Sequence, residues 1–264
     1  MSNLIVVKIG GSVITEKASR RPVLKTRVLK QIAKELRTYL RMKKIPLILI
    51  HGVGSFAHPL AKRYALHKTA KTGKNMLGSA RTRSAVQRLQ TEVSDIFIKA
   101  GLPVFSLSAS SLAVQSKGKI RYFNVAPVMT LLKNNYIPLL AGDVAADVES
   151  EVSILSGDQI TSFLSNNLLA RRVIFLSDVR GVYSDDPKQN PKARLLSTIL
   201  KTKVKGLSLR KQTSKQNTPD VTGLMQGKLL EVSRISAPVV VCSGLQKGNL
   251  LQALEGKNPG TLIS

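Results

Sequence analysis

Short runs of apolar, often β-branched residues alternate along the chain with longer segments whose apolar positions recur every three or four residues. The first run, Leu4–Ile9, stops at two glycines, which is typical of a buried strand. The next segment, Arg27–Lys44, repeats an apolar residue at every fourth position from Val28 to Leu40. That spacing predicts an amphipathic helix with one buried face.

The same alternation continues to the C-terminal end of the sequence. The predicted strands are Leu47–Ile50, Val104–Leu107, Tyr136–Ala141, Val173–Leu176, Pro238–Cys242 and a last edge strand at Thr261–Ile263. The predicted helices are a segment ending near Leu66, then Leu77–Lys99, Val125–Asn134, Gln159–Ala170, Val221–Ser233 and Asn249–Leu254. We expect Ser156-Gly157-Asp158 to cap the helix Gln159–Ala170, a hairpin at Asp143–Glu151 and a polar, mobile loop at Lys68–Asn75. Repeated strand–helix–strand order predicts an α/β fold, an open αβα sandwich around a mainly parallel sheet.

Length and composition narrow the classes further. The 264 residues are enough for one large domain, residues 1–264, in which we place a soft division near residue 143. An apolar content of 43% excludes global disorder, and the single cysteine, Cys242, excludes a disulfide framework. Cys242 lies in an apolar run and is expected to be a buried, inert thiol. No apolar run is long enough to span a bilayer and no secretory signal is visible, so we expect a cytoplasmic protein.

The net charge of +26 is unevenly spread. From Lys17 to Thr91 there are nineteen Lys and Arg residues and one acid, Glu35, whereas Asp143–Asp186 holds eight acids and three bases. The basic stretch fits either an anionic phosphate ligand or a solvated face. Aromatic residues are only 4% of the chain, and no nucleic-acid-binding signature accompanies the charge. We therefore expect no specific nucleic-acid partner and no membrane partner.

Glycine-rich turns follow three of the predicted strands, where ligands bind in open α/β sheets. The turns are Lys8-Ile9-Gly10-Gly11-Ser12, Gly52-Val53-Gly54-Ser55 and Ser177-Asp178-Val179-Arg180-Gly181. Glycines let backbone N–H groups approach phosphate oxygens, and a helix that starts after the turn adds donors. Each turn alone is weak evidence, because a glycine pair after a strand is more often a simple tight turn, and none matches the common phosphate-loop patterns. Together with the lysines Lys8, Lys17 and Lys228 they predict a phosphate site.

These turns resemble the motifs of the amino acid kinase family. The resemblance continues, in order, through Ser156-Gly157-Asp158, Ser177–Tyr183 and Asp220-Val221-Thr222-Gly223-Leu224-Met225-Gln226-Gly227-Lys228, and covers nearly the whole chain. It implies an open αβα sandwich, usually as a homodimer, with an N-terminal half that binds the acceptor and a C-terminal half that binds the nucleotide.

Within the family, Gly52–Pro59 most resembles the isopentenyl phosphate kinases, because a histidine, His58, follows the glycine-rich turn. Lys17 matches the second active-site lysine of that group. The resemblance implies transfer of the ATP γ-phosphoryl group to isopentenyl phosphate, a step of isoprenoid precursor synthesis in an alternative mevalonate route. Fosfomycin-type kinases share the histidine and remain an alternative, as do kinases of other small phosphates or phosphonates. A non-catalytic nucleotide or polyanion binder on the same fold is the alternative from another class.

The resemblance also implies residue roles. The implied catalytic residues are Lys8, Lys17 and His58. The implied ATP-binding residues are Lys8, Gly10, Gly11, Ser12, Gly54, Asp178, Gly223, Leu224 and Lys228. The implied acceptor-binding residues are Val53, Gly54, His58 and Gly157. No residue is assigned to a protein-held metal, and Mg²⁺ is expected to be carried mainly by ATP.

Three positions depart from the family pattern, since Val53, Ala57 and Leu224 stand where the family has glycines. A β-branched residue at Val53 is compatible with a phosphate-contacting turn only if its φ is negative. Apolar positions of the helix at Leu77–Lys99, from Val86 to Phe97, fit either a pocket for a five-carbon chain or ordinary core packing.

Overall fold

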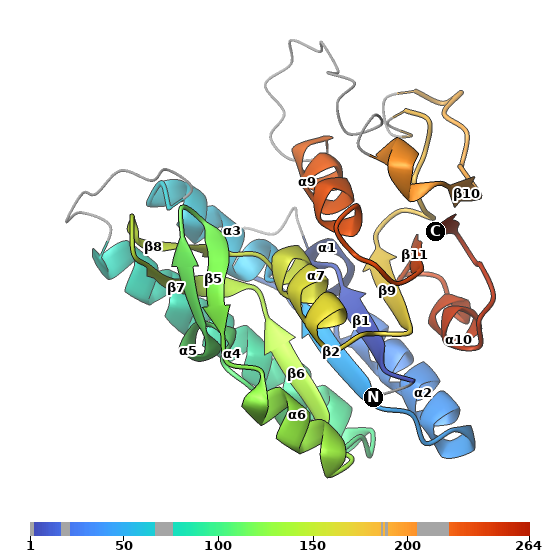
Figure 1. The fold of residues 1–264 in the computed structure, drawn as a ribbon, viewed down its shortest axis with the longest axis horizontal. Coiled ribbons are helices and arrows are strands. Elements are labelled where there is room, and N and C mark those ends of the chain that lie inside the picture. The colour runs from blue at the N-terminus through green and yellow to red at the C-terminus, as the bar shows by residue number, and fades with distance from the viewer. Residues whose placement is uncertain (1–2, 17–21, 67–75, 186, 188–189, 205–221) are drawn as a thin grey trace.

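A large open sheet forms the centre of the computed structural model. The structure describes residues 3–16, 22–66, 76–185, 187, 190–204 and 222–264, and of residues 222–226 it describes only the backbone. The strands of the large sheet are β1 (Ile5–Ile9), β2 (Leu47–His51), β3 (Val104–Ser106), β6 (Ile137–Ala141), β9 (Arg172–Ser177), β10 (Thr198–Ile199), β11 (Val239–Ser243) and β12 (Thr261–Ile263). Their order is β10-β12-β11-β9-β1-β2-β6-β3, so the sheet does not close into a barrel (Figure 1).

Parallel pairing dominates this sheet, which confirms the expected fold class. β1 lies between β2 and β9 and is parallel to both, so the first turn of the chain lies between the turns that follow its two neighbours. β12 is the exception, because it runs antiparallel to β11. The prediction that Thr261–Ile263 forms an edge strand is wrong: β10, too short to give a sequence signal, pairs with the outer side of β12.

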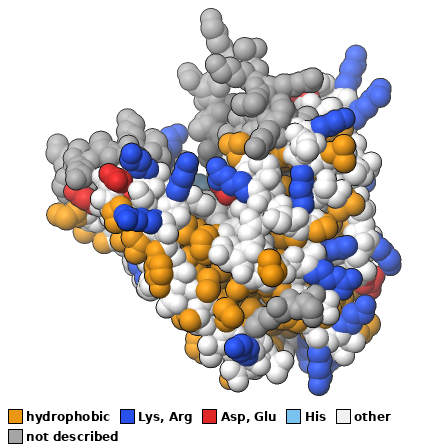
Figure 2. All heavy atoms as spheres, in the orientation of Figure 1, with side chains coloured by type: hydrophobic (Ala, Val, Ile, Leu, Met, Phe, Trp, Pro, Cys, Tyr) orange, Lys and Arg blue, Asp and Glu red, His pale blue; other side chains and the backbone are white. Residues whose placement is uncertain are grey.

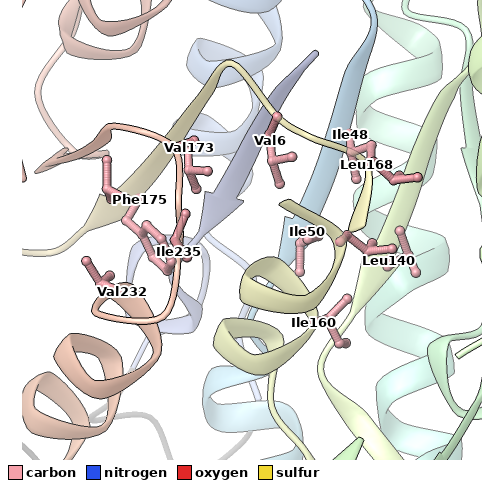
Figure 3. Packing of buried hydrophobic residues seen from close by; sticks show 14 of the residues in the cluster. Val6, Ile48, Ile50, Leu140, Ile160, Leu168, Val173, Phe175, Val232 and Ile235 are labelled. Carbon is pink, nitrogen blue, oxygen red and sulfur yellow. The ribbon is translucent and has the colours of Figure 1, made fainter. Parts of the chain in front are cut away.

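Helices cover both faces of the sheet, because each presents an apolar stripe to it. One face carries α6 (Ala126–Lys133), α7 (Gly157–Asn167) and α9 (Thr222–Val232), and the other carries α2 (Thr26–Met42), α4 (Met76–Lys99) and α10 (Asn249–Leu254). Figure 3 shows Val6, Ile48 and Ile50 directed from the strands toward the helix that carries Ile160. Short helices α1 (Gly11–Ile14) and α3 (Gly54–Arg63) begin directly after β1 and β2.

The apolar positions of α4 belong to the core. Leu89, Val93 and Phe97 are fully buried against α2 and the sheet. Val86 is also buried, in a small cluster near the end of β6. Core packing therefore explains this helix face, and its sequence pattern gives no support for a hydrocarbon pocket. Cys242 is buried as predicted, and burial, together with the nearby Glu35 charge, raises the pKa of its thiol to about 12.

A second, four-stranded sheet stands beside the C-terminal ends of β2 and β6. It pairs β4 (Ala113–Ser116), β5 (Lys119–Phe123), β7 (Asp143–Asp147) and β8 (Glu151–Leu155) in the order β5-β4-β7-β8. The expected hairpin is present as β7 and β8 and extends to Leu155. The preceding hairpin of β4 and β5, with α5 (Ala109–Leu112) before it, was not predicted, because its strands are short and mostly polar. The predicted loop Lys68–Asn75 lies outside the described residues.

The carboxylate of Asp147 joins the turns of both hairpins. Its oxygens accept hydrogen bonds from the backbone N–H groups of Lys117, Gly118, Glu149 and Ser150 and from a serine hydroxyl in β8. Burial alone would raise the pKa of Asp147, but these donors outweigh it and lower the pKa to about 2. The charged carboxylate therefore stabilises the second sheet.

We expect Asp147→Asn to lower the free energy of unfolding by about 2 kcal/mol near neutral pH. The pKa of Asp147 is lower in the folded than in the unfolded protein, so its ionised form stabilises the fold, and asparagine has no such charge. The stabilisation is present above the unfolded pKa near 4 and is lost as the pH falls toward 2. The difference in Tm between the wild-type protein and Asp147→Asn, measured at several values between about pH 2.5 and 7, tests this pH dependence. A difference in Tm that stays constant across the range would contradict the assignment.

Candidate active site

Glycines from several turns come into backbone contact at the C-terminal ends of β1, β2 and β6. A Cβ atom on Gly11 would lie 2.8 Å from the Cα of Gly54, and one on Gly52 would lie 2.6 Å from the backbone nitrogen of Gly11. A Cβ on Gly142 would lie 3.0 Å from the nitrogen of Gly157. Side chains therefore cannot be placed here without moving the backbone, and the glycines leave N–H groups close together at the end of the sheet.

Gly54 is the position in this region where the backbone itself requires glycine. Its φ is +45°, and a Cβ there would overlap the side chain of Thr15. Thr15 is buried, donates from Oγ1 to the carbonyl of Gly11 at 2.8 Å, and accepts from the N–H of Ser55 at 3.0 Å. One threonine thus joins the first two glycine-rich turns, a role that its sequence position did not reveal.

The departures from the family pattern at Val53 and Ala57 fit this geometry. Val53 has φ −98° and ψ −16°, an ordinary right-handed conformation that a β-branched residue adopts without strain. Ala57 is buried and packs with Val53, Val86 and Ala141 in one apolar cluster. The two replacements therefore occupy the same cluster, and neither occupies a position that needs a positive φ.

Lys8 is a buried cation at the end of β1, with 7% of its surface exposed. Its Nζ lies 2.6 Å from Oδ1 of Asp158, in the first turn of α7. The helix begins at Gly157, after its N-cap residue, Ser156. The side chain of Ser156 accepts a hydrogen bond from the backbone N–H of Gln159 at 3.1 Å, as predicted for an N-cap. Asp158 belongs to a motif that the sequence analysis quoted, but it received no role there. Its partner could not be found by spacing, because 150 residues separate the pair.

Cations from three distant segments surround this carboxylate. Burial would raise the pKa of Asp158, but the charge of Lys8, followed by those of Lys228 and His58, lowers it below its usual value. The structure therefore places three predicted site residues, Lys8, Lys228 and His58, within electrostatic reach of one carboxylate. His58 is on the exposed side of α3, and Lys228 is buried in α9. Two of these three side chains, Lys8 and Lys228, are therefore buried, whereas His58 is exposed.

Lys228 reaches the site from the C-terminal half of the chain. Its Nζ lies 3.5 Å from Oγ of Ser177 and 6.0 Å from the ring centroid of Phe175, both on β9. Ser177, at the end of that strand, is a further site residue to which the sequence analysis gave no role. Asp178 follows it and is half-buried.

The remaining predicted residues divide into those that the structure places and those that it does not. Gly10 donates its N–H to the carbonyl of Leu176 at 2.8 Å, which joins the first turn to the end of β9, and Ser12 lies in α1. Gly223 and Leu224 lie in the first turns of α9, where the side chain of Leu224 is not described. Lys17 lies outside the described residues, so its predicted role stays a prediction.

His51, at the end of β2, is fully buried, as expected for a structural residue. Burial lowers the pKa of His51 to about 4, so its ring is neutral at physiological pH, and Nδ1 lies 3.0 Å from the carbonyl of Gly52. In the described part of the chain, no three His, Cys, Asp or Glu side chains are grouped to hold a metal ion. No described helix is long and apolar enough to span a membrane.

Clustered lysines and glycine N–H groups are suited to binding and transferring phosphoryl groups. A model of the amino acid kinase family matches residues 3–253. The chain belongs to the amino acid kinase family. Two relatives within this family match over nearly their whole length. The isopentenyl phosphate kinase of Methanothermobacter thermautotrophicus is 32% identical over 99% of both chains, and that of Methanocaldococcus jannaschii is 30% identical over 98% of both.

Solved structures of the amino acid kinase family agree with the fold. An X-ray structure of an isopentenyl phosphate kinase has a TM-score of 0.84 at 29% identity and covers 99% of this chain and 100% of that one. The product complex of the T. acidophilum isopentenyl phosphate kinase has a TM-score of 0.79 at 26% identity, with the same coverage. The similarity therefore includes both sheets and both halves of this kinase.

We expect restoration of the family glycine by Val53→Gly to give no gain in phosphoryl transfer. The valine already has an unstrained φ, whereas glycine loses its packing and adds chain entropy, at a cost of about 1–2 kcal/mol. Gly54→Ala is the matched comparison, because its φ of +45° and the contact with Thr15 predict a large loss of turnover. Turnover and Tm of both variants measure this. A Val53→Gly enzyme about tenfold faster than wild type would contradict it.

Proposed function

We propose that the protein transfers the γ-phosphoryl group of ATP to isopentenyl phosphate and releases isopentenyl diphosphate and ADP. The observation that carries the proposal is that the charge of His58, with those of Lys8 and Lys228, lowers the pKa of Asp158, beside the glycine-lined end of the sheet. The relatives named isopentenyl phosphate kinase, similar over their full length, support the choice of acceptor.

The donor side of the reaction needs a cradle for the phosphates of ATP. Gly11 and Ser12 supply backbone N–H donors and the Ser12 hydroxyl at the start of α1, and Gly10, whose own N–H is bonded to the carbonyl of Leu176, forms the turn that brings ATP close to them. Lys228 binds the phosphates from the C-terminal half, with Asp178 near the nucleotide. Gly223 and Leu224 bring the first turn of α9 to ATP, and Gly54 contributes from the second turn.

The acceptor is already an oxyanion, so the reaction needs alignment and charge neutralisation more than a strong base. Lys8, together with Lys17, stabilises negative charge on the group in transfer. The backbone of Val53, Gly54 and Gly157 donates to the acceptor phosphate, and His58 positions that phosphate. The paired Asp158 holds Lys8 in place and offsets part of its charge before the substrates bind.

Mg²⁺ belongs with the nucleotide in this proposal. The described residues offer lysines and glycine N–H groups, which suit phosphate oxygens rather than a dication. A Mg²⁺ ion carried by ATP would neutralise phosphate charge that the protein lysines do not reach.

The same resemblance supports further proposals about the setting of the reaction. We place the acceptor mainly in the N-terminal half and the nucleotide mainly in the C-terminal half, divided near residue 143 within one domain. The enzyme is expected to act as a cytoplasmic homodimer in isoprenoid precursor synthesis by an alternative mevalonate route.

An acceptor panel with ATP and Mg²⁺ tests the proposed function. The panel contains isopentenyl phosphate, dimethylallyl phosphate, longer isoprenyl phosphates, fosfomycin, UMP, acetylglutamate and aspartate. We expect isopentenyl phosphate to give the highest kcat/KM. Preference for fosfomycin would favour the phosphonate-kinase alternative, preference for UMP or a carboxylate acceptor would refute the acceptor assignment, and no turnover at all would favour a non-catalytic binder.

The role of His58 is tested separately. Because a charge-directed donor at a reacting centre is worth about 10²-fold, His58→Ala should lower kcat/KM for isopentenyl phosphate by about that factor. His58→Gln keeps a donor and should retain more activity. ATP affinity, measured by calorimetry, should barely change in either variant. If His58→Ala keeps wild-type efficiency or loses ATP binding instead, the acceptor role is wrong.

A further inference from the structure

One face of α2 carries an uninterrupted row of positive charges. Basic residues recur along the helix at alternating steps of three and four positions, and all of them are exposed: Arg27, Lys30, Lys34, Arg37 and Arg41. This periodicity places them along one side of the helix. At a rise of about 1.5 Å per residue the row, which we call the α2 stripe, extends over about 21 Å. In Figure 2, Lys and Arg side chains project along the lower right edge of the molecule, where Figure 1 shows α2 and α10.

No acid on α2 compensates the stripe. The one carboxylate of the helix, Glu35, is buried, with 7% of its surface exposed. Its oxygens accept from Nε2 of Gln31 at 2.7 Å and from the backbone N–H groups of Gly248 and Leu251 at 2.9 and 3.0 Å. Glu35 is thus directed inward, where it holds the start of α10. Among the residues that the structure describes, no acid forms an ion pair with the stripe.

The stability of the helix does not account for this arrangement. Like charges three or four positions apart destabilise a helix by about 0.2–0.5 kcal/mol per pair. The first turn of α2 also contains Arg27 and no acid, although the positive end of the helix dipole favours acids there. The charges therefore work against the local structure, which is held by the buried face around Leu29, Ile32 and Leu36.

We propose that the α2 stripe binds the phosphate backbone of a nucleic-acid duplex without regard to sequence. Its cations repeat about every 5 Å along a rigid helix, and a duplex presents a stiff row of about one negative charge per 1.7 Å of axis. Because α4 and α10 pack on either side of α2, we expect the helix to lie across phosphates instead of entering a groove to read bases.

The surroundings of the stripe favour a linear anion over a membrane surface. α2 packs between α4 and α10, and both flanks are mixed in charge. α4 exposes Glu92 and Asp95 but also Arg88 and Lys99, and Glu255, just after α10, pairs with Lys257. Positive charge uninterrupted by acids is therefore confined to the narrow α2 stripe. No aromatic residue is exposed on α2, because Tyr39 is buried, so the stripe offers single strands no stacking surface.

Fluorescence anisotropy with a labelled DNA duplex, and a second duplex of scrambled sequence, tests the proposal on the full-length protein without ATP or acceptor. Both duplexes should bind equally. The logarithm of the binding constant should fall with the logarithm of salt with a slope of about −4.5, from about −0.9 per phosphate contact for five cations. The triple variant Lys30→Gln, Lys34→Gln and Arg37→Gln should bind at least about tenfold more weakly and reduce that slope by about 3.

A matched variant controls for net charge. Arg121→Gln, Lys133→Gln and Lys192→Gln removes three exposed cations outside α2, on β5, α6 and the segment after β9. It should change the slope little, and both triple variants should keep wild-type phosphoryl transfer and Tm. Equal loss of binding in the two variants would overturn the proposal. So would a marked preference for one duplex sequence, no duplex binding at about 50 mM salt, or tighter binding to vesicles of phosphatidylglycerol and phosphatidylcholine than to the duplex. Because the binding measurements contain no ATP or acceptor, their outcome is independent of the proposed kinase activity.

Discussion

Close backbone approach between glycine turns is the constraint on which the site depends. Gly11, Gly52 and Gly54 follow adjacent strands and lie nearer to one another than any Cβ permits, and Gly142 and Gly157 repeat the contact on the next side. Parallel strands bring these turns to one end of the sheet, and the absence of side chains lets backbone donors converge there. Lys8 and Lys228 lie at this same end of the sheet, beside Asp158 and Ser177.

Two carboxylates, the partly buried Asp158 and the buried Glu35, show how so basic a chain uses its few acids. Asp158 pairs with Lys8 and is also subject to the charges of Lys228 and His58, so Lys8 is held in position at the end of the sheet. Glu35 is turned inward to bind the start of α10, which leaves the outer face of α2 positive. In both cases the position of one acid sets the charge pattern around it. The excess of cations is therefore organised in two separate places, at the end of the sheet and along α2.

Local sequence patterns predicted those features of the fold that depend on residues close together in the sequence. The strand ends, the cap at Ser156, the helices on both faces and the buried Cys242 all follow from periodicity and turn residues. Contacts between distant segments could not be predicted in this way. Nothing in the spacing of Lys8 and Asp158 identifies them as a pair, and the φ of Val53 depends on its tertiary setting. The edge position of the sheet belongs to β10, which pairs with β12 through two residues only. The polar β4–β5 hairpin gave no hydrophobic signal and is held instead by Asp147.

The account rests on Lys8 as the cation that meets charge on the transferring group. The most direct test is the turnover of Lys8→Ala with ATP, Mg²⁺ and isopentenyl phosphate, together with its Tm. Turnover should fall by roughly 10²-fold or more while the protein stays folded, because the lost charge acts in the transition state. The double variant Lys8→Ala with Asp158→Asn also removes the carboxylate left without its partner, so the measurement remains decisive if the single variant is unstable. Near-wild-type turnover in either folded variant would contradict the account.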